Sequence, residues 1–197
     1  MSDELMPIIP DIGIIEKRLL SLQKKKDVVL GLSRDVIRIA GKAITDMHAG
    51  NMKRARAEMK RLDSLVSRLR SAERGLEYFS MQAHQEYVEA VAFYTVLMEH
   101  RLASARELRV GEIPYLLGIM DLTGELKREA LESIRNGDIG SADSYYGFMK
   151  GIYDSTRAMR FANSLVPEFR RKQDTARIQL ESIAGELASS GRKPRYV

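Results

Sequence analysis

Residues 87–98 read YVEAVAFYTVLM, and Glu89 is the only charged residue in this apolar run. Residues 113–126 read IPYLLGIMDLTGEL and repeat the pattern, with Asp121 and Glu125 as the only charges. Neither stretch alternates apolar and polar residues with the period of two that a half-buried strand requires. The two stretches therefore predict adjacent, largely buried helices in the core of an all-α protein.

Amphipathic segments flank these two stretches on both sides. Apolar residues recur three or four positions apart from Met52 to Leu69, and a similar pattern covers the preceding 39 residues, 11–49. Gly and Pro residues mark the borders between the segments, as they commonly do between helices. The sequence thus predicts one all-α domain spanning residues 1–197, an antiparallel helical bundle with flexible ends at 1–10 and 190–197. Six helices are expected from the pattern, over residues 11–49, 52–69, 76–102, 112–135, 138–165 and 167–189.

The composition excludes several classes of protein. The 197 residues include no Cys, which rules out a disulfide scaffold, a thiolate metal site and a catalytic thiol. No apolar run reaches the roughly 18–20 residues that a membrane span needs. The first four residues, MSDE, are acidic where a signal peptide would be basic. We therefore expect a soluble cytoplasmic protein that has no membrane partner.

Charge is distributed unevenly along the chain. The net charge is +5, but residues 75–143 are acidic whereas the segments on either side of them are basic. Basic residues concentrate on the second predicted helix, where they form either a solvated outer face or a surface that neutralises phosphates. The candidate nucleic-acid-binding residues are Lys53, Arg54, Lys60, Arg61, Arg68, Arg70 and Arg74.

Four acidic residues lie where the two core helices should be apolar. Glu86 and Glu89 are three residues apart, and Asp121 and Glu125 are four apart, so each pair shares one side of its helix. A buried ionised carboxylate costs several kcal/mol unless it is paired, protonated or bound to a cation. Three explanations remain open: ion pairs with Arg or Lys, a shared divalent cation, or a di-iron centre. Oxygen-only ligands suit Mg²⁺ or Mn²⁺, whereas the di-iron centre requires Glu-x-x-His pairs that the sequence lacks.

The three His residues and two Gly residues near the acids have simpler interpretations. His48 and His100 lie at predicted helix ends, where a capping or dipole role suffices. We expect His84 at a surface or an interface. Gly118 and Gly124 lie on either side of Asp121 and serve either close helix packing or space for a ligand.

Three strings characterise the two core helices: residues 85–91, QEYVEAV, residues 115–118, YLLG, and residues 121–126, DLTGEL. Residues 32–35, LSRD, come before them and residues 136–139, NGDI, follow them. In content and order these strings resemble the translin superfamily, and its translin-associated factor X branch more closely than translin itself. The resemblance extends from about residue 25 to 185.

The resemblance implies an all-α fold of about seven helices that assembles into a closed, octameric shell around nucleic acid. It also implies a Mg²⁺-dependent endoribonuclease whose catalytic and metal-binding acids are Glu86, Glu89, Asp121 and Glu125. The expected partners are single-stranded or short duplex RNA, and single-stranded DNA. Residues 103–112 are shorter than the matching region of the eukaryotic factor, which favours a prokaryotic homo-oligomer without a separate translin subunit.

Two other functions remain compatible with the sequence. In the first, the protein is a non-catalytic, translin-like protein that binds single-stranded DNA or RNA, and its acids are structural. In the second, it is a helical adaptor that contacts only other proteins. Metal-dependent cleavage of nucleic acid would distinguish the enzyme from both.

Overall fold

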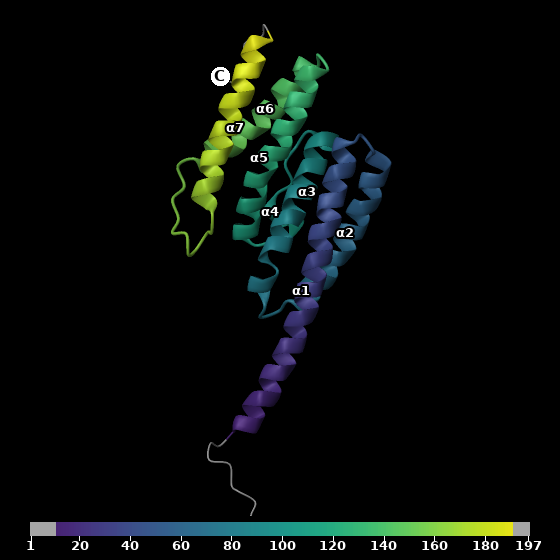
Figure 1. Cartoon of the computed structure of the whole chain (residues 1–197), viewed down its shortest axis with the longest axis vertical. Coiled ribbons are helices and arrows are strands. Elements are labelled where there is room, and N and C mark those ends of the chain that lie inside the picture. The colour runs from purple at the N-terminus through teal and green to yellow at the C-terminus, as the bar shows by residue number, and fades with distance from the viewer. Residues whose placement is uncertain (1–10, 191–197) are drawn as a thin grey trace, which may run out of the picture.

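Seven α-helices and one 3-10 turn run through residues 11–190, the part of the chain that the computed structural model describes (Figure 1). No strand occurs in this part, so the predicted all-α bundle is confirmed. The segments 1–10 and 191–197, which the sequence predicts to be flexible, lie outside the described residues. The elements are α1 (Ile12–His48), α2 (Met52–Ala72), η1 (Glu77–Phe79), α3 (Met81–Glu99), α4 (Ala105–Leu108), α5 (Glu112–Arg135), α6 (Ile139–Thr156) and α7 (Phe169–Ser189).

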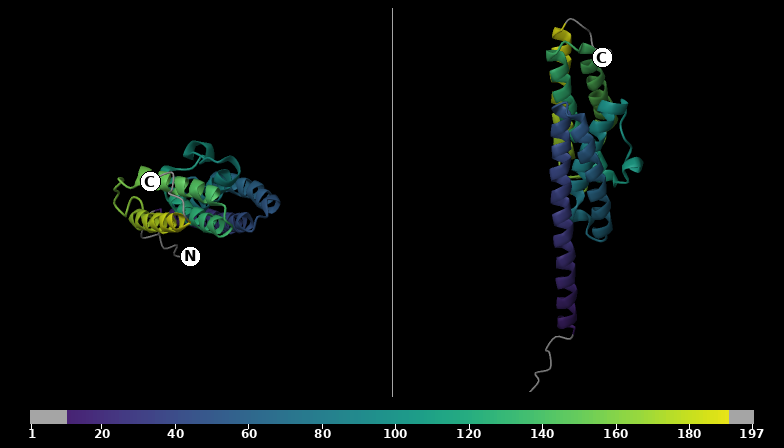
Figure 2. Two further views of the ribbon diagram at one scale, coloured as in Figure 1. Left: turned by 90° about the horizontal axis from the view of Figure 1, so that it is seen from above. Right: turned by 90° about the vertical axis from the view of Figure 1, so that its right-hand side faces the viewer.

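The two apolar helices identified in the sequence, α3 and α5, pack against each other at the centre of the bundle. α1 and α2 form a hairpin against α3, while α6 and α7 pack against α5. Figure 2 shows the helices in two layers, with α1 and α7 in one layer and α2 and α6 in the other. Among the described helices, none has an apolar stretch long enough to cross a bilayer.

The N-terminal half of α1 extends beyond the bundle, as both views show (Figures 1 and 2), and along it Leu19, Leu22 and Lys26 line a pocket together with Leu76 and Phe79. Burial along α1 begins only at Val29. The extended half nevertheless carries large apolar side chains that are about half exposed. They are Ile12, Ile14, Ile15, Leu19, Leu20, Leu22 and Val28.

Close packing of α3 on α5 depends on Gly118. A Cβ atom at this position would lie 2.7 Å from the backbone oxygen of Gln85 and 2.7 Å from Cβ of Val88. Of the two interpretations of Gly118, the structure supports close helix packing. At Gly124 the nearest atom is Nε2 of Gln179, at 3.4 Å, so this position is less tightly enclosed.

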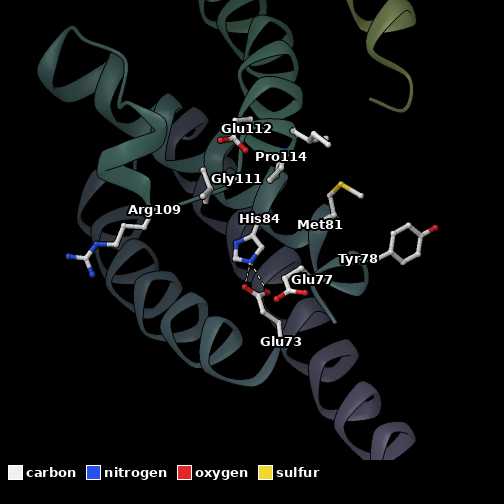
Figure 3. Close-up of a pocket in the computed structure, with 11 residues that line it drawn as sticks. Glu73, Glu77, Tyr78, Met81, His84, Arg109, Gly111, Glu112 and Pro114 are labelled. Atoms are coloured by element: carbon white, nitrogen blue, oxygen red, sulfur yellow. Dashed lines mark hydrogen bonds and ion pairs between the residues drawn. The ribbon is translucent and has the colours of Figure 1, made fainter. Parts of the chain in front are cut away.

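The turn between α2 and α3 corrects two predictions. Helix α3 begins at Met81 rather than near residue 76, because Gly75 adopts a φ of 79° and donates its N–H to Glu77 Oε1 at 2.9 Å. His84 is buried rather than exposed, and its Nε2 lies 2.8 and 3.0 Å from the two carboxylate oxygens of Glu73 (Figure 3). This pair joins the end of α2 to the start of α3.

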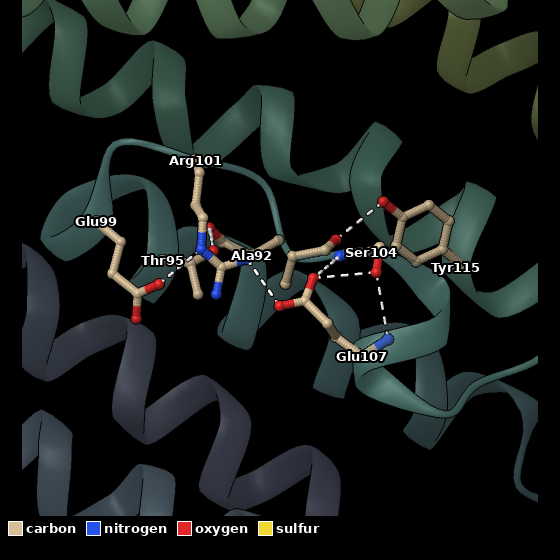
Figure 4. A network of polar contacts seen from close by, with 8 residues as sticks. Ala92, Thr95, Glu99, Arg101, Ser104, Glu107 and Tyr115 are labelled. Carbon is tan, nitrogen blue, oxygen red and sulfur yellow. Dashed lines mark hydrogen bonds and ion pairs between the residues drawn. The ribbon is translucent and has the colours of Figure 1, made fainter.

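The connection between α3 and α5 contains the short helix α4, which the sequence pattern does not predict. Ser104 and Glu107 form a capping box at the start of α4, and Arg101 bridges Glu99 and Glu107 (Figure 4). Tyr115 donates its hydroxyl hydrogen to the backbone oxygen of Ala103 at 2.9 Å. These contacts tie the end of α3 to the first turn of α5.

The predicted helix over residues 138–165 is too long. α6 ends at Thr156, and an irregular segment leads from there to α7. Gln173 of α7 donates hydrogen bonds to the backbone oxygens of Thr156, at 2.7 Å, and Met159, at 3.3 Å. The contact with Thr156 satisfies the carbonyl group of the last residue of α6, which would otherwise lack a partner.

Replacing Gly118 by Ala should destabilise the protein by about 1–3 kcal/mol, because the added methyl group forces α3 and α5 apart. Gly41→Ala in α1 is the matched control, since nothing lies within 4 Å of its added Cβ. There the better helix propensity of Ala should stabilise the protein slightly. Urea unfolding of both variants measures the difference, and equal stability of the two would refute the packing role of Gly118.

Candidate functional site

The structure brings the four predicted acids together between α3 and α5. Glu86 and Glu89 lie one turn apart on α3, and Asp121 and Glu125 lie one turn apart on α5. The charges of Asp121, Glu86 and Glu125 all act on Glu89 and raise its pKa. We call these four residues the acidic cluster.

Glu89 is the most strongly perturbed member of the acidic cluster. It is only 8% exposed, and burial together with the charges of Asp121 and Glu86 raises its pKa to about 9. Burial and the charge of Asp121 also raise the pKa of Glu86. No other residue in the described part of the chain forms a hydrogen bond or a salt bridge with either carboxylate. The charge of Lys172 lowers the pKa of both acids, but burial and the neighbouring carboxylates outweigh it.

Asp121, in contrast, is held by two side chains. Lys172 of α7 forms an ion pair with Oδ1, and Gln85 of α3 donates to Oδ2 at 2.5 Å. Lys172 is largely buried, with 14% of its side chain exposed. The ion-pair explanation of the acids thus applies to Asp121, with Lys172 as the partner.

Glu125 is held by His48, which the sequence analysis assigned to a capping or dipole role. The His48 ring lies at the end of α1 with only 4% of its side chain exposed. Its Nε2 contacts Glu125, and its Nδ1 lies 2.5 Å from Oε1 of Glu129. Burial lowers the pKa of His48, but the hydrogen bonds to Glu125 and Glu129 outweigh burial and raise the pKa above its usual value. With a carboxylate at each ring nitrogen, the doubly protonated ring donates to both.

The donor set of the acidic cluster fits a hard divalent cation. Four carboxylates face one ammonium group and one imidazole, which leaves the cluster short of positive charge, and Mg²⁺ and Mn²⁺ prefer carboxylate oxygens. The side chains are not yet arranged around an ion. Within residues 11–190, no three His, Asp or Glu side chains form a group that could hold a metal ion as they stand. Asp121 and Glu125 instead face Lys172 and His48.

The basic residues of α2 divide into two groups. Arg70 is engaged inside the protein: its Nη2 donates to the backbone oxygen of Leu108, and its guanidinium lies 5.6 Å from the centre of the Tyr87 ring. A hydrogen bond from Arg38 of α1 lowers the pKa of Asp35, and the charges of Arg61 and Arg68 lower it further. Arg56 is exposed and donates from Nε to the Tyr94 hydroxyl at 3.2 Å. The other exposed basic residues of α2, together with Arg74 just after its end, form a group that we call the basic face: Lys53, Arg54, Lys60, Arg61, Arg68 and Arg74.

Sequence reasoning missed the side chains that orient the acids. Lys172 and Glu129 lie among other charged residues on amphipathic helices, so nothing in the sequence singles them out. The packing of α7 brings Lys172 to Asp121, and the packing of α1 brings His48 to Glu129. Gln85 was noted only as part of the QEYVEAV string. For His48, the absence of a Glu-x-x-His pair excluded one metal arrangement but did not address pairing across helices.

The fold and the site define an all-helical protein that gathers four carboxylates from two adjacent core helices. The chain belongs to the Translin family, whose model matches residues 20–184. An uncharacterized protein of Methanocaldococcus jannaschii is 26% identical, over 94% of this chain and 85% of that protein. Translin-associated protein X of Pongo abelii is 32% identical over 36% of this chain, a match that spans about a third of that relative.

Solved structures extend the comparison to the fold. A structure of AfC3PO in complex with duplex RNA matches with a TM-score of 0.85 and 28% identity, covering 91% of this chain and 96% of that one. Apo-NeC3PO matches with a TM-score of 0.84 at 23% identity, covering 94% of this chain and 100% of that one.

Glu89 should make the stability of the metal-free protein depend on pH. Its carboxyl group keeps a proton in the folded state up to a pKa of about 9, whereas the unfolded chain loses this proton near 4.5. Because the folded state binds more protons between these values, the free energy of unfolding falls as pH rises from about 4.5 to about 9. Glu89→Gln removes this contribution and should flatten the profile.

Urea unfolding in EDTA at several pH values measures the effect. Glu132→Gln is the control, because Glu132 lies on the same helix as Asp121 but its side chain is half exposed. The control should keep the pH dependence of the parent protein. Identical profiles for Glu89→Gln and the parent would mean that Glu89 is ionised in the folded protein.

Proposed function

We propose that this protein is a metal-dependent endoribonuclease of the translin-associated factor X type. The single observation that carries the proposal is a pair of carboxylates beside Asp121 and Glu125, the buried Glu89 and the half-buried Glu86, neither of which forms an ion pair and both of which have a raised pKa. A purely structural network would pair all four acids. A cluster that remains short of positive charge is instead suited to bind a cation.

Glu86, Glu89, Asp121 and Glu125 would hold Mg²⁺, with Mn²⁺ as a substitute. When bound, the ion lowers the pKa of a water molecule and stabilises charge on a phosphate. His48 fixes the orientation of Glu125, and Gln85 fixes that of Asp121. Lys172 supplies an ammonium group beside Asp121 that can contact a phosphate oxygen of the substrate.

RNA is the proposed substrate. AfC3PO, at 28% identity, has been solved with duplex RNA, and the basic face of this chain provides cations that can neutralise phosphates without reading sequence. Single-stranded RNA, short duplex RNA and single-stranded DNA are the candidate ligands. Arg70 is left out of this interface because its guanidinium contacts Leu108 and Tyr87.

We also propose that the chain works as a closed homo-oligomer, with the octamer implied by the resemblance as the expected form. The apolar side chains on the extended half of α1 support assembly, because seven of them are about half exposed in the single chain. Burying apolar area of this kind against another copy removes it from water.

A cleavage assay with labelled single-stranded RNA and DNA, in Mg²⁺ and in EDTA, tests the enzymatic proposal. The parent protein should cut RNA only with the metal. Glu89→Gln and Asp121→Asn should each slow cleavage by about a hundredfold or more, because several kcal/mol of transition-state stabilisation are lost. RNA binding in EDTA should persist in both variants and weaken steeply with added salt.

Glu132→Gln is again the control and should cleave at the parent rate, since its side chain is half exposed and pairs with Arg135. Binding without metal-dependent cleavage by the parent would favour the non-catalytic nucleic-acid-binding protein. Neither binding nor cleavage would favour the adaptor. Parent-like cleavage by both acid variants would show that the acidic cluster is not the catalytic centre.

A further inference from the structure

A cavity of about 480 Å³ opens directly beside Asp121 and is not used in the proposed function. Gln85 and Lys172, which both contact Asp121, form part of its wall. Tyr78 and Phe79 of η1 also line it, together with Gln82 of α3. Its volume lies within the range of about 300–1,000 Å³ that is typical of small-ligand sites.

The two aromatic residues of this cavity are unusually exposed. Tyr78 is 79% exposed and Phe79 is 40% exposed, and their rings meet edge to face with centroids 5.6 Å apart. In Figure 3 the ring of Tyr78 points away from His84. The turn is held by the hydrogen bond from the Gly75 N–H to Glu77, so the aromatic pair is presented by an ordered segment. An aromatic face of this kind is suited to stacking rather than to core packing.

The polar groups of the cavity suit the remaining parts of a nucleotide. Gln82 carries an amide that can both donate to and accept from a base edge, while Gln85 donates to Asp121. The ammonium group of Lys172, which pairs with Asp121, can bind a phosphate oxygen. Glu168 also lines the cavity, and its carboxylate pairs with Arg171.

We propose that this nucleotide cavity binds one unpaired nucleotide of RNA next to the phosphodiester that is cleaved. The base stacks on Tyr78, and the phosphate lies near Lys172. This inference rests on the proposed endoribonuclease function and assigns to this cavity the nucleotide beside the cleaved bond. A base inside a duplex is already stacked on its neighbours and cannot enter without unpairing, which costs a few kcal/mol.

The chain contains no Trp, so Tyr78→Trp introduces a single fluorescent reporter at the cavity. The substitution keeps an aromatic platform at an exposed position. In EDTA, a short single-stranded RNA should quench this fluorescence in a saturable manner, and a blunt duplex of the same sequence should not. Ile178→Trp is the matched control, because Ile178 is 58% exposed on α7 and does not line the cavity. Its fluorescence should change with neither RNA.

Tyr78→Ala should weaken binding of single-stranded RNA by about tenfold and leave duplex binding unchanged, because only a stacked base is lost. Equal quenching by both RNAs, or quenching as strong in the control as at Tyr78, would overturn the proposal. Metal-dependent cleavage by the parent without quenching of Tyr78→Trp would refute the cavity alone. Selective quenching without any cleavage would support the cavity as an RNA site and refute the endoribonuclease.

Discussion

The burial of carboxylates between two apolar helices is the constraint on which the rest of this structure depends. An ionised group removed from water must gain a proton, a cationic partner or a metal ion. In the metal-free chain the acidic cluster uses the first two: Glu89 keeps its proton, Asp121 pairs with Lys172, and Glu125 pairs with His48. A divalent cation that entered the cluster would replace the proton on Glu89 and the Lys172 contact of Asp121, while His48 would still orient Glu125. Metal binding at the site therefore depends on the protonation of Glu89 and on the position of Lys172.

Helix packing determines which side chains reach the acidic cluster. Gly118 allows α3 and α5 to approach until their acids influence one another electrostatically. The end of α1 brings His48 from one side, and α7 brings Lys172 from another. The cluster thus draws on four helices that are far apart in the sequence. This explains how a chain whose described residues form no strand can still build a defined polar site in its core.

Periodicity was sufficient to predict the class of the fold and most helix boundaries. It was also sufficient to select the four acids, because charges are conspicuous in stretches that are otherwise apolar. The predictions for the end of α6 and for the position of His84 were wrong, because both depend on tertiary contacts. Gln173 of α7 binds the backbone oxygen of Thr156, where α6 ends, and the buried His84 pairs with Glu73. Pairs between side chains of different helices, such as Lys172 with Asp121, cannot be predicted from a single sequence. The same holds for Arg70, whose charge suggested a phosphate contact but whose guanidinium contacts Leu108 and Tyr87.

The most direct measurement of the central claim is the position of a metal ion in a crystal of this protein grown with Mn²⁺. Anomalous diffraction should show a peak bounded by carboxylate oxygens of Glu86, Glu89, Asp121 and Glu125, with the Lys172 ammonium displaced from Asp121. A crystal that contains Mn²⁺ but shows no peak between α3 and α5, with Lys172 still on Asp121, would contradict it.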